Sequence, residues 1–190
     1  MKKILKIIIS ILILIPIFLG SILIFTNGNL KYTEEIEIQS STEIVDQLFS
    51  NIYNMKKYIA GTKDIILIDG MDGVEGAEYK IIWEMGKESM EMKGTLKDYN
   101  LPDSITFVYE MPGIVNTVTQ KHHMISENRT LIINEQEFQF SGVMEMVAFF
   151  KPNGFNINSF KAQTKIYLEA FKSFVENNTT TVLKHEELKS

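Results

Sequence analysis

The sequence predicts an α+β protein in which an N-terminal transmembrane helix is followed by an antiparallel, curved sheet wrapped around one long C-terminal helix. Three patterns indicate this. The chain begins with an apolar run, then carries apolar side chains at every second position for about 80 residues, and ends with apolar side chains at helical spacing. We expect residues 1–30 to be an anchor and linker, residues 31–178 a single domain, and residues 179–190 a polar tail.

The N-terminal run has the length of a membrane-spanning helix. Three lysines precede 19 apolar or small residues from Ile7 to Phe25, which would form a helix of about 28 Å, close to the thickness of the hydrocarbon core. A cleaved signal peptide and a buried core helix are the alternatives, but the run is long for a signal peptide and no small-residue cleavage site follows it. The apolar anchor residues include Ile7, Leu12, Leu14, Phe18, Leu23 and Phe25.

The charges on either side of this run predict its orientation. Lysines lie before the run, whereas only Lys31 follows it closely and three glutamates come next. Because positive residues stay on the cytoplasmic side, we expect a single-pass protein of the cell membrane with a cytoplasmic N-terminus and an extracytoplasmic domain. Secretion after signal cleavage is the alternative.

A strand and two short helices open the domain. Residues Lys31 to Ile38 alternate as in a strand, and the segment from Ser40 to Glu43 has the spacing of a helix capping box. Apolar residues then follow at helical spacing as far as Ile52. We expect a second short helix from Asn54 to Ile59, ended by Gly61.

The alternating region predicts a meander of antiparallel strands. A two-residue loop at positions 86–87 would place Trp83 opposite Met90 and Ile81 opposite Met92, so that two apolar faces coincide. The remaining predicted strands and pairings are these: residues 65–68 form the first strand, a turn lies at residues 100–103, and a loop at residues 112–113 pairs Ile105 with Gln120, Phe107 with Val118, and Tyr109 with Asn116. The last strand, Thr130 to Phe140, has apolar residues on both faces and no predicted register.

One amphipathic helix should end the domain. Its apolar stripe runs from Phe160 to Val175, with Asn156 or Asn158 as the cap. We expect this helix to stop at residues 177–178, which are both asparagine.

This order of elements resembles the START-like helix-grip fold, the SRPBCC superfamily, which includes polyketide cyclase/dehydrase-like proteins. The opening strand with its capped helix, the segment Lys57-Tyr58-Ile59, the meander, and the helix from Phe155 to Val175 carry the resemblance, which covers nearly the whole soluble part. It implies a deep, mostly apolar pocket for lipids, sterols, polyketides or other hydrophobic small molecules. It implies no fixed catalytic set.

Composition argues against several classes of function. Beyond residue 30 the chain has 16 Lys and Arg against 24 Asp and Glu, a net charge of −8, so nucleic acid is not an expected partner. There is no cysteine, and the common nucleophile and phosphate-binding motifs are absent. His122 and His123 are adjacent, so they point to opposite faces of a strand and cannot share a metal. No cofactor, metal or catalytic residue is therefore assigned.

The predicted inward face contains the candidate pocket residues Trp83, Phe107, Tyr109, Gln120, His122 and Tyr167. The Tyr109 hydroxyl would be a polar handle, and inward polar side chains need partners from the protein, water or a ligand. These aromatic residues are also typical of an ordinary core, and His122 is also typical of a satisfied buried histidine.

Three functions fit these observations. The first is a membrane-anchored domain that binds a hydrophobic small molecule or lipid between sheet and C-terminal helix, without catalysis. The second is a cyclase- or dehydratase-like enzyme that uses His122 and Tyr109 as acid and base. The third is a protein-interaction module whose cavity is filled by its own side chains.

Overall fold

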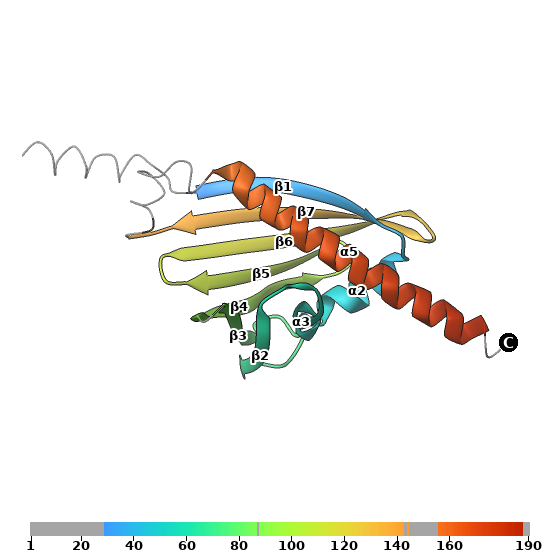
Figure 1. Ribbon diagram of the computed structural model, residues 1–190, viewed down its shortest axis with the longest axis horizontal. Helices are drawn as coiled ribbons and strands as arrows, with labels where there is room; N and C mark the ends of the chain where they lie inside the picture. The colour runs from blue at the N-terminus through green and yellow to red at the C-terminus, as the bar shows by residue number, and fades with distance from the viewer. Residues whose placement is uncertain (1–28, 87, 143, 145–155, 188–190) are drawn as a thin grey trace, which may run out of the picture.

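A single antiparallel sheet of seven strands forms the body of the protein in the computed structural model (Figure 1). The structure describes residues 29–86, 88–142, 144 and 156–187. The predicted anchor, residues 7–25, lies outside this range. Among the described residues, no helix combines the length and apolar character needed to cross a membrane.

The strands follow one another in the order β1-β7-β6-β5-β4-β3-β2, so the first two strands along the chain form the two edges of the sheet. Their bounds are β1 Asn29–Ile38, β2 Thr62–Asp69, β3 Glu78–Met85, β4 Glu88–Asn100, β5 Ser104–Met111, β6 Ile114–Ser126 and β7 Arg129–Phe140. All six pairings are antiparallel. The meander predicted from the alternation is thus confirmed.

The predicted hairpin registers are also confirmed. Trp83 pairs with Met90 across β3 and β4, and Phe107 pairs with Val118 across β5 and β6. The register of β7, which the sequence leaves open, places Ile132 opposite both Ile36 of β1 and His122 of β6. One face of each strand therefore looks toward the helices.

The helices after β1 are α2 Thr42–Ser50, the 3₁₀ turn η1 Ile52–Asn54, and α3 Met55–Tyr58. The predicted capping box is wrong by one residue. The cap is Ser41, whose hydroxyl accepts from the Ile44 amide at 3.5 Å, whereas the Ser40 hydroxyl is buried and bonded to Thr179 of the C-terminal helix.

The C-terminal helix α5, Ile157–Glu187, lies diagonally across the sheet (Figure 1). It runs beyond the predicted stop at residues 177–178, so that prediction is wrong. The Asn178 side chain donates to the Phe174 carbonyl at 2.6 Å and the Thr179 hydroxyl donates to the Val175 carbonyl at 3.0 Å. These side chains bond back along the helix and do not compete with it.

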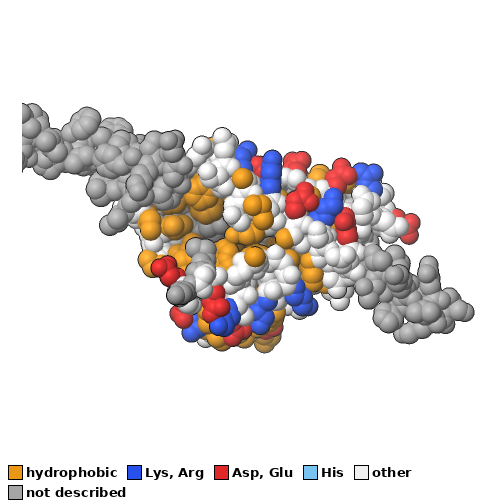
Figure 2. All heavy atoms as spheres, in the orientation of Figure 1, with side chains coloured by type: hydrophobic (Ala, Val, Ile, Leu, Met, Phe, Trp, Pro, Cys, Tyr) orange, Lys and Arg blue, Asp and Glu red, His pale blue; other side chains and the backbone are white. Residues whose placement is uncertain are grey.

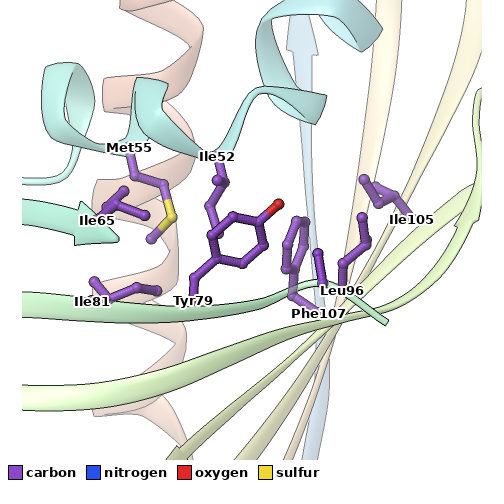
Figure 3. Packing of buried hydrophobic residues seen from close by; sticks show 9 residues of the cluster. Ile52, Met55, Ile65, Tyr79, Ile81, Leu96, Ile105 and Phe107 are labelled. Carbon is purple, nitrogen blue, oxygen red and sulfur yellow. The ribbon is translucent and has the colours of Figure 1, made fainter. Parts of the chain in front are cut away.

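Two apolar clusters fill the space between the sheet and the helices. The first joins η1 and α3 to β2–β5, and Figure 3 shows Met55 beside Ile65 and Ile52 above Tyr79. The second joins α2 and α5 to β1 and β7; its members are Ile38, Val45, Ile132, Leu168, Phe171 and Val175. The helices thus cover two separate parts of the same face of the sheet, one over β2–β5 and the other over β1 and β7.

The edge strand β2 pairs irregularly with its only neighbour, β3. Its register shifts between Thr62 and Asp64 and again between Leu67 and Asp69. Ile66 and Ile68 are exposed on this strand, while Ile65 is buried in the first cluster. The outer edge of β2 faces no other strand in the sheet.

Ile132 and Ile68 allow the same substitution to be compared in the core and on the surface. Ile132→Ala removes a fully buried side chain from the second cluster and should lower the free energy of unfolding by about 2–5 kcal/mol. Ile68→Ala, at an exposed site, should change it by less than about 0.5 kcal/mol. Urea unfolding of the full chain in mild detergent, followed by circular dichroism, measures both. Equal losses would contradict the assignment of the core.

Candidate functional site

A cavity of about 300 Å³ lies between the concave face of the sheet and α5. Its wall combines residues of all seven strands with residues of α2, η1, α3 and α5. The two clusters of the core lie on either side of it and share Phe49 and Tyr58 as partly buried neighbours. The cavity thus lies over the part of the concave face that neither apolar cluster fills.

Five of the six predicted pocket residues lie on the wall of this cavity: Trp83, Phe107, Tyr109, Gln120 and Tyr167. The rings of Phe107 and Tyr109 stack with their centroids 6.0 Å apart on neighbouring inward positions of β5. The Trp83 and Tyr167 rings lie 6.2 Å apart and bring β3 close to α5. Whether these residues contact a ligand remains a prediction.

His122 faces inward but does not reach the cavity wall. Its side chain is fully buried, with Nδ1 2.5 Å from the Asp46 carboxylate and Nε2 3.2 Å from the Gln120 side-chain oxygen. The edge of Phe49 packs against it, with ring centroids 5.5 Å apart. Both ring nitrogens are therefore engaged by protein groups, and Gln120 stands between the histidine and the cavity.

A strip of side-chain amides crosses the cavity wall on β6 and β7. Asn116 donates to the Gln136 side-chain oxygen at 2.9 Å, and Gln136 donates to the Asn134 side-chain oxygen at 2.7 Å. The side-chain oxygen of Asn116 is buried and has no partner in the described part of the chain. A buried acceptor without a partner costs about 1–3 kcal/mol, so a ligand or water that donates to it would stabilise this wall.

Two of these amides were not predicted from the sequence. Asn134 and Gln136 share the inward face of β7 with Ile132 and Phe138, but that strand also has apolar residues on its other face. Only the register with β6 shows which face looks inward. The inward positions of Asn116 and Gln120 followed from the β5–β6 hairpin loop.

The described wall of the cavity has no charged side chain, and its ionisable groups are four tyrosines. Burial raises the pKa of Tyr58 and of Tyr109 well above the usual tyrosine range. Burial also raises the pKa of Tyr32, although its hydrogen bond to Thr164, 2.9 Å long, opposes this, and burial raises the pKa of Tyr167. The cavity is uncharged at neutral pH. No group of three His, Asp or Glu side chains able to hold a metal occurs within the described ranges.

Comparisons with known proteins identify the architecture. No family model matches the sequence, and no curated protein sequence matches it. The solved structures that match include three proteins: the ZhuI aromatase/cyclase from Streptomyces sp. R1128 (TM-score 0.60, 8% identity, 78% of this chain and 94% of that one), TTHA0849 from Thermus thermophilus (0.64, 9%, 79% and 99%) and norcoclaurine synthase from Thalictrum flavum (0.56, 13%, 77% and 86%). This chain has the helix-grip fold. At these identities the likeness shows the fold alone.

The burial of Tyr58 predicts that the free energy of unfolding falls at alkaline pH. In the unfolded chain a tyrosine ionises near pH 10.0, whereas the folded chain keeps the Tyr58 proton. Stability is therefore retained below pH 10 and lost as the pH rises above it, by up to about 1.4 kcal/mol per pH unit. Tyr58→Phe should make the decline shallower above about pH 10, while the two proteins run parallel below it. Urea unfolding across this range measures the slopes, and parallel slopes throughout would contradict the prediction.

The adjacent histidines offer a matched pair for the buried hydrogen-bond network. His122→Ala removes the Phe49 contact and leaves Asp46 and Gln120 without their partner, and should destabilise the fold by about 2–4 kcal/mol. His123→Ala, at the exposed neighbour, should cost less than about 0.5 kcal/mol. Thermal and urea unfolding of the two variants compare them, and a neutral His122→Ala would show that the network adds nothing.

Proposed function

We propose that this chain is a membrane-anchored helix-grip protein that binds an uncharged, largely apolar small molecule or lipid, without catalysing a reaction on it. The observation that carries the proposal is the open, uncharged cavity between the sheet and α5. Its volume lies at the lower end of the range of small-molecule sites.

The chemistry of the wall favours a neutral ligand. A charged group brought into this cavity would meet no opposite charge on the described wall, and burial of an unpaired charge is strongly unfavourable. The aromatic and aliphatic lining suits hydrocarbon. The amide strip from Asn116 to Asn134 adds one polar side, which suits a ligand that carries a hydroxyl or carbonyl group.

The arrangement of the ionisable groups favours binding over acid–base catalysis. The cyclase-like alternative requires His122 beside Tyr109 at the cavity, but His122 lies behind Gln120 with both nitrogens bonded. The Tyr109 hydroxyl lies 3.9 Å from the Met55 sulfur, and burial holds it protonated. Norcoclaurine synthase, of the same fold, has been solved with dopamine and hydroxybenzaldehyde. This supports a small organic ligand, and it bears equally on the enzyme alternative because that protein is a synthase.

The membrane part of the proposal rests on the sequence. The run from Ile7 to Phe25 is long enough to span the bilayer, and the lysines before it favour a cytoplasmic N-terminus. The domain would then stand on the extracytoplasmic side. The interaction-module alternative expects a cavity filled by the protein's own side chains, and the volume between sheet and helix argues against it.

Binding can be measured through Trp83, which is the only tryptophan of the chain and lies on the cavity wall. N-phenyl-1-naphthylamine, an uncharged apolar fluorophore, should show saturable energy transfer from Trp83 when titrated into the full chain in lipid nanodiscs. Val118→Phe fills the cavity from β6 and should weaken this binding at least about tenfold.

Val115→Phe is the control, because it makes the same change on the opposite face of the same strand. It should bind the fluorophore as the wild type does. If all three proteins give the same non-saturating signal, the fluorophore resides only in the lipid and the proposal fails.

A further inference from the structure

The cavity opens toward the end of the sheet where β1 begins. Lining residues at its deep end are almost fully buried, as Phe171 and Gln120 show with 2% and 6% exposure. Lining residues at the other end, including Met111 and Phe160, keep part of their surface accessible. Antiparallel pairing brings the end of β5 and the start of β6 to the same end as the start of β1. The mouth therefore lies beside the first described residue, Asn29.

The rim of this mouth is apolar. Figure 2 shows hydrophobic side chains gathered around a recess below the first half of α5. The rim consists of Met90, Met111, Phe140, Met144, Ile157 and Phe160, of which three are more than a third exposed. Two contacts join the β5–β6 turn to the residues that follow β7. The Ser141 amide donates to the Gly113 carbonyl at 2.9 Å, and Met144 lies against Gly113. An exposed apolar ring around an opening is typical of an interaction surface.

Several charged side chains near this end are paired with one another. Lys31 lies 3.0 Å from Glu137, and Glu34 receives both Lys161 and Lys165, at 3.5 and 3.3 Å. The two pairs of Glu34 hold the first half of α5 to β1, and the Lys31–Glu137 pair joins β1 to β7. Pairing reduces the net charge that these side chains present beside the apolar rim.

The anchor predicted from the sequence would bring this end close to the membrane. Four residue steps separate Phe25, the last residue of the predicted anchor, from Asn29, and a fully extended chain covers them in about 14 Å. The far end of β1, at Ile38, lies about 30 Å further along the strand. The anchor therefore restricts the mouth to the neighbourhood of the bilayer and leaves the far end free.

We propose that the rim rests on the bilayer beside the anchor and that the ligand is an uncharged lipid that enters the cavity directly from the membrane. This inference rests on the proposed function and adds that the membrane is the source of the ligand. A lipid that passes from hydrocarbon to cavity avoids exposing its chain to water, which costs about 0.8 kcal/mol for each methylene. The apolar rim supplies a continuous path for such a chain, and the amide strip receives its polar group.

Lipids with brominated acyl chains test the orientation, because bromine quenches indole fluorescence only at short range. The full chain is reconstituted in phosphatidylcholine vesicles with and without the brominated lipid. Trp83, near the mouth, should be strongly quenched. A single tryptophan at the far end of β4, made by Trp83→Phe with Tyr99→Trp, should not be.

Equal quenching at both positions, or none at either, would overturn the inference. Val118→Phe separates it from the proposed function. If Trp83 stays quenched while all proteins fail to bind the naphthylamine, the mouth faces the bilayer but the cavity takes no ligand. If the naphthylamine binds saturably but brominated lipid leaves Trp83 unquenched, the cavity binds and the membrane-facing mouth is wrong.

Discussion

The rest of this structure depends on how much of a seven-stranded concave sheet one helix can cover. α5 presents a single stripe of apolar residues, and Leu168, Phe171 and Val175 bury it against the side formed by β1 and β7. The 3₁₀ turn η1 and the short helix α3 cover part of the other side through Ile52 and Met55. The space between the two covers stays open and forms the cavity. The cavity therefore follows from the unequal widths of sheet and helix.

The incomplete covering of the sheet by helices also explains why polar side chains lie in the interior. β6 and β7 pass below the open space, and their inward positions carry Asn116, Gln120, Asn134 and Gln136 where a closed core would carry aliphatic residues. Hydrogen bonds among the amides offset most of the loss of water, and Asp46 and His122 support Gln120 from behind. Such a network favours one arrangement of the wall and so restricts which polar groups a ligand can place there.

The sequence predicts the hairpins well because two independent signals agree in them. The alternation assigns each side chain to a face, and a two-residue loop sets which residue lies opposite, as for Trp83 and Met90. β7 lacks the first signal, since apolar residues occupy both of its faces. Its register depends on contacts with β1 and β6 that are distant in sequence, and therefore Asn134 and Gln136 were missed.

Local sequence also fails where tertiary contacts override it. The cap of α2 moves to Ser41 because Ser40 is buried against α5. The helix α5 continues past residues 177–178, where the side chains of Asn178 and Thr179 bond back along the helix. For His122 the alternation gave the correct face but not the depth, since only the packing of Phe49 and Gln120 keeps the ring from the cavity.

The irregular pairing of β2 has a consequence for contacts between copies of this chain. An open sheet edge is a template for strands of neighbouring copies, and β2 exposes Ile66 and Ile68 beside such an edge. The two register shifts interrupt the regular spacing of its amides and carbonyls, and Lys63 and Asp64 add charge. An incoming strand would find no continuous ladder to extend, which disfavours edge-to-edge pairing between copies.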